Sequence, residues 1–190
     1  MIVGALIYVL VSGQAALVLG WTRGMESYSV GSRSMEPLLF RDSVVFGRPL
    51  APGQGVGRGN LVAFRVGEAP MNGSRDILLK RIVAIPGDRV EVDSQGAVTV
   101  WAGTERSQGT TYCMPGEWSE REPQAWMLPE GHYFVLGDNC WQSIDSRSPG
   151  IGLVPHEDIE AIILFRQDGR FDIVPIETPE PYTTLPEPPS

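Results

Sequence analysis

The strongest constraint on the fold is a repeated pattern of short β-branched and aromatic runs separated by glycine- and proline-rich turns. Such runs are typical of strands, because these side chains suit a pleated surface while Gly and Pro favour turns. After residue 25, no long segment has the apolar period of an amphipathic helix. The pattern predicts a mainly β domain over residues 23–175. The predicted strands are 43–46, 61–66, 77–85, 89–92, 97–101, 133–136 and 161–165.

Two further segments differ from this pattern. Residues 103–130 are polar, and we predict a polar insertion or long loop there. Residues 176–190 are rich in Pro and Glu, a composition that buries little apolar surface. This tail is predicted to be extended or disordered.

The N-terminal segment, residues 1–22, contains no Asp, Glu, Lys or Arg and is mostly apolar. About 20 apolar residues at a rise of about 1.5 Å each cross a hydrocarbon core of roughly 30 Å. Trp21 and Arg23 follow the run, as is typical of a membrane interface. A cleaved signal peptide would begin with basic residues, and a buried core helix would rarely be uncharged for so long. We expect one transmembrane anchor, with an orientation that the nearby charges leave open.

Charge and ligand counts narrow the classes of function. The chain carries 23 acidic and 15 basic residues, a net charge of −8, which argues against a nucleic-acid partner. Two His and two Cys fit no recognisable zinc-site spacing, and we expect neither a metal nor another cofactor. Cys113 and Cys140 could form a disulfide in an oxidising compartment or remain free thiols.

The basic residues are unevenly divided, because fourteen are Arg and one is Lys80. Lys80 lies in an apolar run, residues 77–83, whose other charged residue is Arg81. In a strand these neighbours face opposite sides, so Lys80 faces either solvent or the interior. If it faces inward, burial lowers the amine pKa. A neutral amine near pH 7, which requires a fall of about 3 units or on the order of 4 kcal/mol, is a general base.

Two polar segments complete the candidate chemistry. Residues 32–37 read S-R-S-M-E-P, placing two hydroxyl groups two residues apart just beyond the apolar segment. Residues 137–147 read G-D-N-C-W-Q-S-I-D-S-R and directly follow an apolar run. Within the second segment, Asp145 and Arg147 could pair in an extended backbone. Each segment taken alone is also compatible with an ordinary polar turn or loop.

Together, these motifs resemble type I signal peptidases of the bacterial Ser/Lys kind. The resemblance rests on S-x-S-M-x-P, the Lys-Arg strand followed by P-G-D, and G-D-N-x-x-x-S-x-D-S-R, in that order. Residues 58–64, R-G-N followed by an apolar strand, are similar to a further family motif. With the preceding apolar segment, the resemblance covers roughly residues 1–165.

The resemblance implies a role for each matching residue. Ser34 would be the nucleophile and Lys80 its general base. Ser32 would help to form the oxyanion hole with the Ser34 backbone N–H. Ser143 would hold the Lys80 amine by a hydrogen bond, and Asp145 and Arg147 would form a supporting ion pair.

The chain departs from the family pattern at several positions. Arg33 stands between the two serines where Gly is usual, and Leu38 stands where Thr is common. Asn60 replaces the usual Asp, and residues 140–142 are C-W-Q where R-D-N is typical. The position of Arg33 beside the nucleophile raises the question of whether its side chain narrows or recharges the cleft.

The resemblance implies a membrane-anchored serine endopeptidase that removes signal peptides from exported preproteins. It further implies a single-pass cell-membrane protein, in contact with the lipid bilayer, whose catalytic domain is extracytoplasmic. Two alternatives remain: a specialised Ser/Lys peptidase for conjugation or pilus precursors, and an inactive membrane-anchored binding protein with the same fold.

Overall fold

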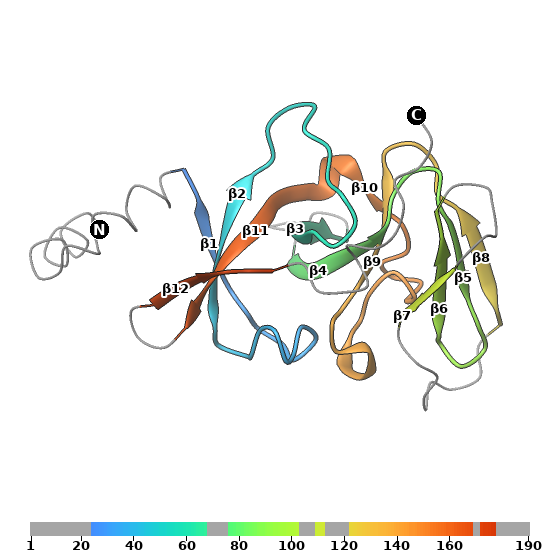
Figure 1. Ribbon diagram of the computed structural model, residues 1–190, viewed down its shortest axis with the longest axis horizontal. Coiled ribbons are helices and arrows are strands. Elements are labelled where there is room, and N and C mark those ends of the chain that lie inside the picture. Colours follow the sequence, from blue (N-terminus) through green and yellow to red (C-terminus); the bar gives the residue numbers. More distant parts are fainter. Residues whose placement is uncertain (1–23, 68–75, 103–108, 113–121, 169–171, 178–190) are drawn as a thin grey trace, which may run out of the picture.

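The computed structural model describes residues 24–67, 76–102, 109–112, 122–168 and 172–177. Within these ranges the chain forms two antiparallel sheets and two 3-10 helices, which confirms the mainly β prediction (Figure 1). The elements are β1 (Glu26–Ser29), β2 (Val44–Pro49), β3 (Leu61–Val66), β4 (Asp76–Ala84), β5 (Arg89–Val92), β6 (Val98–Trp101), β7 (Thr110–Tyr112), β8 (Gln124–Met127), β9 (His132–Leu136), η1 (Cys140–Gln142), β10 (Val154–Pro155), η2 (His156–Asp158), β11 (Ile159–Asp168) and β12 (Asp172–Pro175).

The larger sheet has the strand order β1-β2-β11-β3-β4-β9-β10, and β12 also pairs with β11. β3 and β4 run antiparallel, with Leu61 opposite Arg81 and Val62 opposite Lys80. β9 pairs with the other edge of β4, so β4 lies inside the sheet. The predicted candidate base is therefore carried by an interior strand.

The smaller sheet, on the right of Figure 1, has the order β7-β6-β5-β8. β7 and β8 fall within residues 103–130, where the sequence predicted an insertion or long loop. Thr110–Tyr112 pairs with β6 and Gln124–Met127 pairs with β5, so these residues form strands instead. Pairing with β5 and β6, whose valines are buried, supplies the stabilisation that these short strands lack on their own.

The described residues form three buried apolar clusters that stabilise the domain. One joins the smaller sheet to the ends of β4 and β9, through residues such as Val90, Val100 and Leu136. A second lies between the β1–β2 connection and the larger sheet, where Met35 and Leu39 are buried. Burying a side chain of this size contributes about 1.5–3 kcal/mol. The connection between β1 and β2 is therefore held against the sheet.

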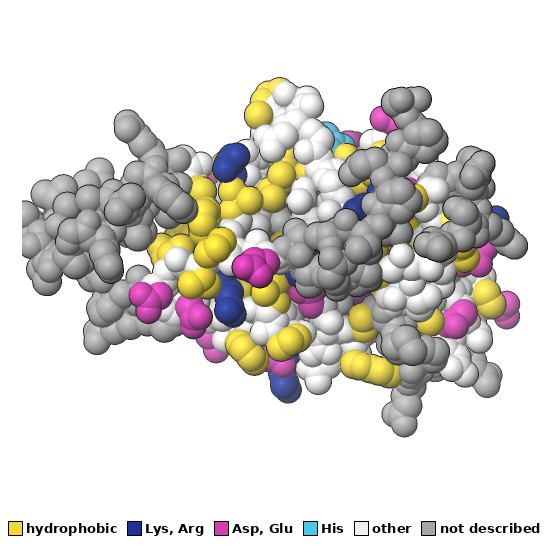
Figure 2. Space-filling view, viewed as in Figure 1, with side chains coloured by type: hydrophobic (Ala, Val, Ile, Leu, Met, Phe, Trp, Pro, Cys, Tyr) yellow, Lys and Arg dark blue, Asp and Glu magenta, His cyan; other side chains and the backbone are white. Residues whose placement is uncertain are grey.

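Part of the apolar surface remains accessible. On the face shown in Figure 2, apolar side chains gather over the region of β1, β2 and β12. Ile176, just after β12, packs against the second cluster, so the first residue of the predicted tail contributes to the core. Residues 178–190 of that tail lie outside the described residues.

The predicted transmembrane anchor, residues 1–22, also lies outside the described residues. Within the ranges that the structure describes, no helix has the length and apolar character needed to cross a membrane.

Candidate active site

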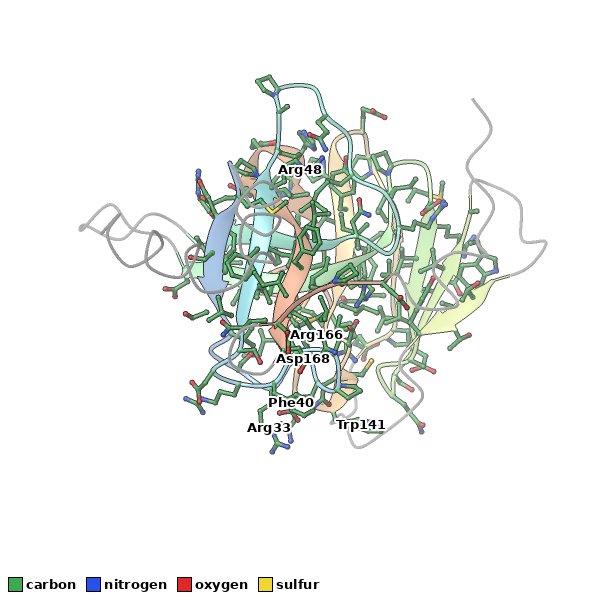
Figure 3. All side chains as sticks on the ribbon, turned by 60° about the vertical axis from the view of Figure 1, so that its left-hand side comes forward. Arg33, Phe40, Arg48, Trp141, Arg166 and Asp168 are labelled. Atoms are coloured by element: carbon green, nitrogen blue, oxygen red, sulfur yellow. The ribbon has the colours of Figure 1, made fainter. Side chains whose placement is uncertain are left out.

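The connection between β1 and β2 carries Ser34, whose side chain is buried. Its neighbour Met35 packs into the second apolar cluster, and Leu39 donates its backbone N–H to the Met35 carbonyl at 2.9 Å. Arg166 of β11 donates to the Leu38 carbonyl at 3.0 Å (Figure 3 labels Arg166). These contacts fix the backbone on the C-terminal side of Ser34 to the larger sheet.

Lys80 faces the interior, with 3% of its surface exposed. Its Nζ donates a hydrogen bond to Ser34 Oγ at 2.7 Å and another to the Leu79 carbonyl at 2.9 Å. The alternative of a solvent-facing Lys80 is thus wrong. The contact brings together two residues 46 positions apart in the sequence.

Burial changes the protonation of this amine. Because the charged form is poorly solvated inside the protein, the pKa of Lys80 falls from 10.5 to about 8. The carboxylates of Asp145 and Asp138 act in the opposite direction and limit the fall. The result is a base that is partly neutral near physiological pH. The fall in pKa is somewhat smaller than the roughly 3 units expected for an amine that is neutral at pH 7.

Ser32 lies at the outer side of Ser34. The two hydroxyl oxygens are 3.1 Å apart, and the Ser34 backbone N–H points to Ser32 Oγ at 3.4 Å. Ser32 is exposed, unlike Ser34. A hydroxyl group and a backbone N–H are therefore available next to the Ser34 hydroxyl, the two kinds of donor that stabilise an oxyanion.

The connection that follows β9 packs directly on the Ser34 backbone. A Cβ added at Gly137 would lie 2.5 Å from the Ser34 carbonyl oxygen and 2.3 Å from Ser143 Oγ. The absence of a side chain at Gly137 is what permits this close approach. Asn139 then donates its backbone N–H to the Ser34 carbonyl at 2.9 Å.

Ser143 is buried beside Gly137, but its hydroxyl oxygen has no hydrogen-bond partner among the described residues. The predicted hydrogen bond from Ser143 to the Lys80 amine is therefore not present in the structure. Ser143 lies next to the candidate site, and its role there remains a prediction.

Asp145 and Arg147 form the predicted ion pair, and both are almost completely buried. The guanidinium donates to both carboxylate oxygens, at 2.8 and 2.9 Å. Asp145 also accepts the Gly137 N–H at 3.2 Å, and Arg147 donates to the Cys140 carbonyl at 2.9 Å. The pair holds the connection after β9 at both ends.

Two further ion pairs were not predicted, and each joins two of the sequence motifs. Arg81 donates through two nitrogens to the carboxylate of Asp138, at 2.7 and 2.6 Å. Arg58 donates to Asp88 at 2.9 Å, and both side chains are buried. The available sequence signals were Arg81 within the apolar run 77–83 and the Gly-Asp pairs 87–88 and 137–138 that follow apolar runs.

The departures from the family pattern leave the buried contacts intact. The Arg33 side chain is 60% exposed and forms an ion pair with Glu36 at 3.0 Å. In Figure 3, Arg33 lies at the lower edge of the molecule, near Phe40 and Trp141 in that view. Asn60 accepts the Gly57 N–H at 2.9 Å, a bond that an amide oxygen makes as well as a carboxylate.

The predicted disulfide involves one residue that can be described. Cys140 is not a free thiol, whereas Cys113 lies outside the described residues. The pairing of the two remains a prediction. Among the described residues, no group of three or more His, Cys, Asp and Glu side chains is arranged to hold a metal ion.

Comparisons with known proteins identify relatives of this chain. The family model for signal peptidase, peptidase S26, matches residues 3–167. Signal peptidase IB of Staphylococcus aureus is 28% identical over 124 residues, covering 59% of this chain and 61% of that protein. Signal peptidase I P of Bacillus subtilis subsp. natto is 26% identical over 156 residues, covering 75% and 78%.

Among solved structures, a signal peptidase I from Enterococcus faecalis V583 matches at 24% identity, with a TM-score of 0.37. The match covers 57% of this chain and 97% of that one. The match to the S. aureus relative spans less than two thirds of that protein's length. Because the family model covers most of the sequence, the chain belongs to the signal peptidase family, peptidase S26.

Proposed function

We propose that this protein is a serine endopeptidase that removes signal peptides from exported preproteins, with Ser34 as nucleophile and Lys80 as general base. The observation that carries the proposal is the 2.7 Å contact between Lys80 Nζ and Ser34 Oγ in a buried site. Membership of the signal peptidase family supports the substrate class. The lowered pKa of Lys80 supports its role as a base.

In the acylation step, neutral Lys80 takes the proton of the Ser34 hydroxyl while Oγ attacks the scissile carbonyl carbon. The Ser34 N–H and the Ser32 hydroxyl stabilise the negative oxygen of the tetrahedral intermediate. When the intermediate collapses, the Lys80 ammonium gives its proton to the leaving amine. This leaves the signal peptide bound to Ser34 as an ester.

Deacylation repeats these proton transfers with water. Lys80 takes a proton from a water molecule, whose oxygen attacks the ester carbonyl carbon. The second tetrahedral intermediate collapses, and the Ser34 oxygen recovers a proton from the Lys80 ammonium. Asp145, Arg147 and Ser143 do not exchange protons in this scheme, and they position the backbone beside Ser34.

The uncharged apolar segment, residues 1–22, supports the remainder of the proposal. It would anchor the protein in the cell membrane as a single span, with the catalytic domain on the extracytoplasmic side. A membrane-bound preprotein presents its cleavage site near the bilayer, so an anchored enzyme meets its substrate at a high effective concentration.

The test is cleavage of a general secretory preprotein by the purified full chain, with product masses identifying the cut. Ser34→Ala is expected to abolish cleavage because it removes the proposed nucleophile. Lys80→Arg is expected to do the same, because Arg does not lose its proton in this pH range. Arg33→Ala, which changes an exposed neighbour, serves as the matched control. Wild-type cleavage by the Lys80→Arg variant would refute the assignment of the base.

A further inference from the structure

We infer that Asn139 is a positioning residue for the oxyanion hole, because its side chain holds the peptide group whose N–H points toward the developing oxyanion. The inference rests on the proposed function and extends it to a residue with no assigned role. Asn139 Nδ2 donates to the Arg33 carbonyl at 3.1 Å.

The geometry of a peptide group makes this contact significant. The Arg33 carbonyl and the Ser34 N–H belong to one planar unit, so fixing one end fixes the direction of the other. The Ser34 N–H points to Ser32 Oγ at 3.4 Å, on the side where the two serine hydroxyls meet. The hydrogen bond at the Arg33 carbonyl therefore determines where the Ser34 N–H points.

Hydrogen bonding at one end of a peptide group also strengthens donation at the other end. A carbonyl that accepts a hydrogen bond polarises its own peptide group, which makes the attached N–H a better donor. Asn139 thus acts on the oxyanion donor twice, by orienting it and by polarising it. Neither effect requires Asn139 to touch the substrate.

The same residue holds the peptide group on the other side of Ser34. The Asn139 backbone N–H donates to the Ser34 carbonyl at 2.9 Å. One residue therefore fixes both peptide groups that flank the candidate nucleophile. This backbone contact persists in any variant of the Asn139 side chain, which separates the two functions experimentally.

The local structure around Asn139 does not account for its amide group. Asn139 is the N-cap residue of η1, a position where an Asn side chain commonly accepts a backbone N–H. Here the side chain makes no capping hydrogen bond. Its amide donor is directed across to the Arg33 carbonyl.

Asn139 is itself held in place through Asp138. The carboxylate of Asp138 pairs with Arg81, which follows Lys80 on β4. Contacts thus run in a closed path from Ser34 to Lys80, along β4 to Arg81, across to Asp138 and Asn139, and back to the Ser34 backbone. The candidate base and the oxyanion donor are therefore positioned from the same strand.

The test compares variants of Asn139 with a charge-matched control in the same segment. Asn139→Ala removes the donor, and Asn139→Asp replaces it with a carboxylate that faces the Arg33 carbonyl. Gln142→Glu makes the same amide-to-carboxylate change at an exposed residue. Each variant is assayed for kcat and KM on a peptide that spans a signal-peptide cleavage site, and for thermal unfolding.

We expect kcat to fall about threefold to tenfold for Asn139→Ala, the typical effect of one neutral hydrogen bond. The fall should be larger for Asn139→Asp and absent for Gln142→Glu. KM should stay within about twofold for every variant. The apparent pKa in the pH profile of Asn139→Ala should equal the wild-type value, because the Lys80–Ser34 contact is unchanged.

The inference is overturned if folded Asn139→Ala and Asn139→Asp keep the wild-type kcat. It is also overturned if their loss appears in KM or in a shifted pH profile. Should Asn139→Asp fail to fold, Asn139→Ala decides alone. Failure of the proposed function looks different, because wild type and Gln142→Glu would then both leave the peptide uncut.

Discussion

Replacing Gly137 with Ala tests whether the backbone beside Ser34 must be as close as the structure places it. The new Cβ would lie 2.3 Å from Ser143 Oγ, 2.5 Å from the Ser34 carbonyl oxygen and 2.6 Å from Ser143 Cβ. Ordinary contacts of a Cβ begin near 3.4 Å, so these neighbours must move by about 1 Å. Two of the three atoms are not the far ends of flexible side chains, so the backbone must shift.

The expected loss can be estimated from this displacement. A misplacement of about 1 Å in a reacting group can lower the rate on the order of 100-fold. Overpacking of a buried position costs about 1–3 kcal/mol of folding free energy, which leaves most domains folded. We therefore expect Gly137→Ala to remain folded, to unfold at a lower temperature, and to cleave peptide with a kcat about 100-fold lower.

The assay is peptide cleavage together with thermal unfolding, and Gly150→Ala is the control. Gly150 is exposed and has no atom within 4 Å of an added Cβ, so its variant should match wild type. In a second comparison, adding Ser143→Ala to Gly137→Ala removes the nearest oxygen but leaves the Ser34 carbonyl 2.5 Å away. The double variant should therefore recover little activity relative to Ser143→Ala. A folded Gly137→Ala protein with the kcat of Gly150→Ala would refute the reasoning.

Three further predictions concern charge. Neutral Lys80 is the active form and its pKa is about 8. We therefore expect kcat/KM to rise about tenfold per pH unit below pH 8 and to stay constant above it. A pH profile with its midpoint near 10.5 would contradict this prediction. Lys80→Met should be more stable than wild type at pH 7 by up to about 3 kcal/mol in urea unfolding. The buried Lys80 ammonium opposes folding below its folded-state pKa, so the stability difference between Lys80→Met and wild type should shrink as pH rises from about 8 to 10.5. A stability difference that stays constant over this pH range would contradict the prediction. Arg33→Ala should keep both kcat and unfolding temperature, since its ion pair with Glu36 is exposed, whereas a tenfold fall in kcat would place the guanidinium among the reacting groups.

The sequence predicted those strands whose own residues determine them. Residues 61–66 and 89–92 were predicted with the bounds that β3 and β5 have in the structure. β8 was missed because it is short, three of its four residues are exposed, and it lies within a largely polar segment. Its formation depends on pairing with β5, a non-local contact that no short sequence window contains.

The environment of Lys80 was only partly predictable for a related reason. Strand alternation places Lys80 and Arg81 on opposite faces, and a strand with one buried face would expose one of them. The end of β4 is instead buried on both faces, and Arg81 has no exposed surface. Whether both faces are covered depends on β9, the smaller sheet and the connection after β9, most of which lie far from β4 in the sequence.

The motifs identified the candidate site residues but not their contacts. Ser34 and Lys80 do meet, and Asp145 and Arg147 do pair. No sequence motif indicates that Asn139 contacts the Arg33 carbonyl, because that hydrogen bond depends on how two connections pack. Contacts between loops require the three-dimensional structure, even where each loop is recognisable by its residues.

The adjacency of Lys80 and Arg81 on β4 has a consequence for how misfolding of this protein would be detected. If β4 paired with β3 one residue out of register, every side chain of β4 would change face. A permanently charged guanidinium would then point at Ser34, and the amine would point at Asp138. Circular dichroism would report the same amount of β structure in such a species, yet it would have no proton acceptor at Ser34. Turnover per folded molecule is therefore a more sensitive measure of correct strand alignment in this protein than any spectroscopic estimate of sheet content.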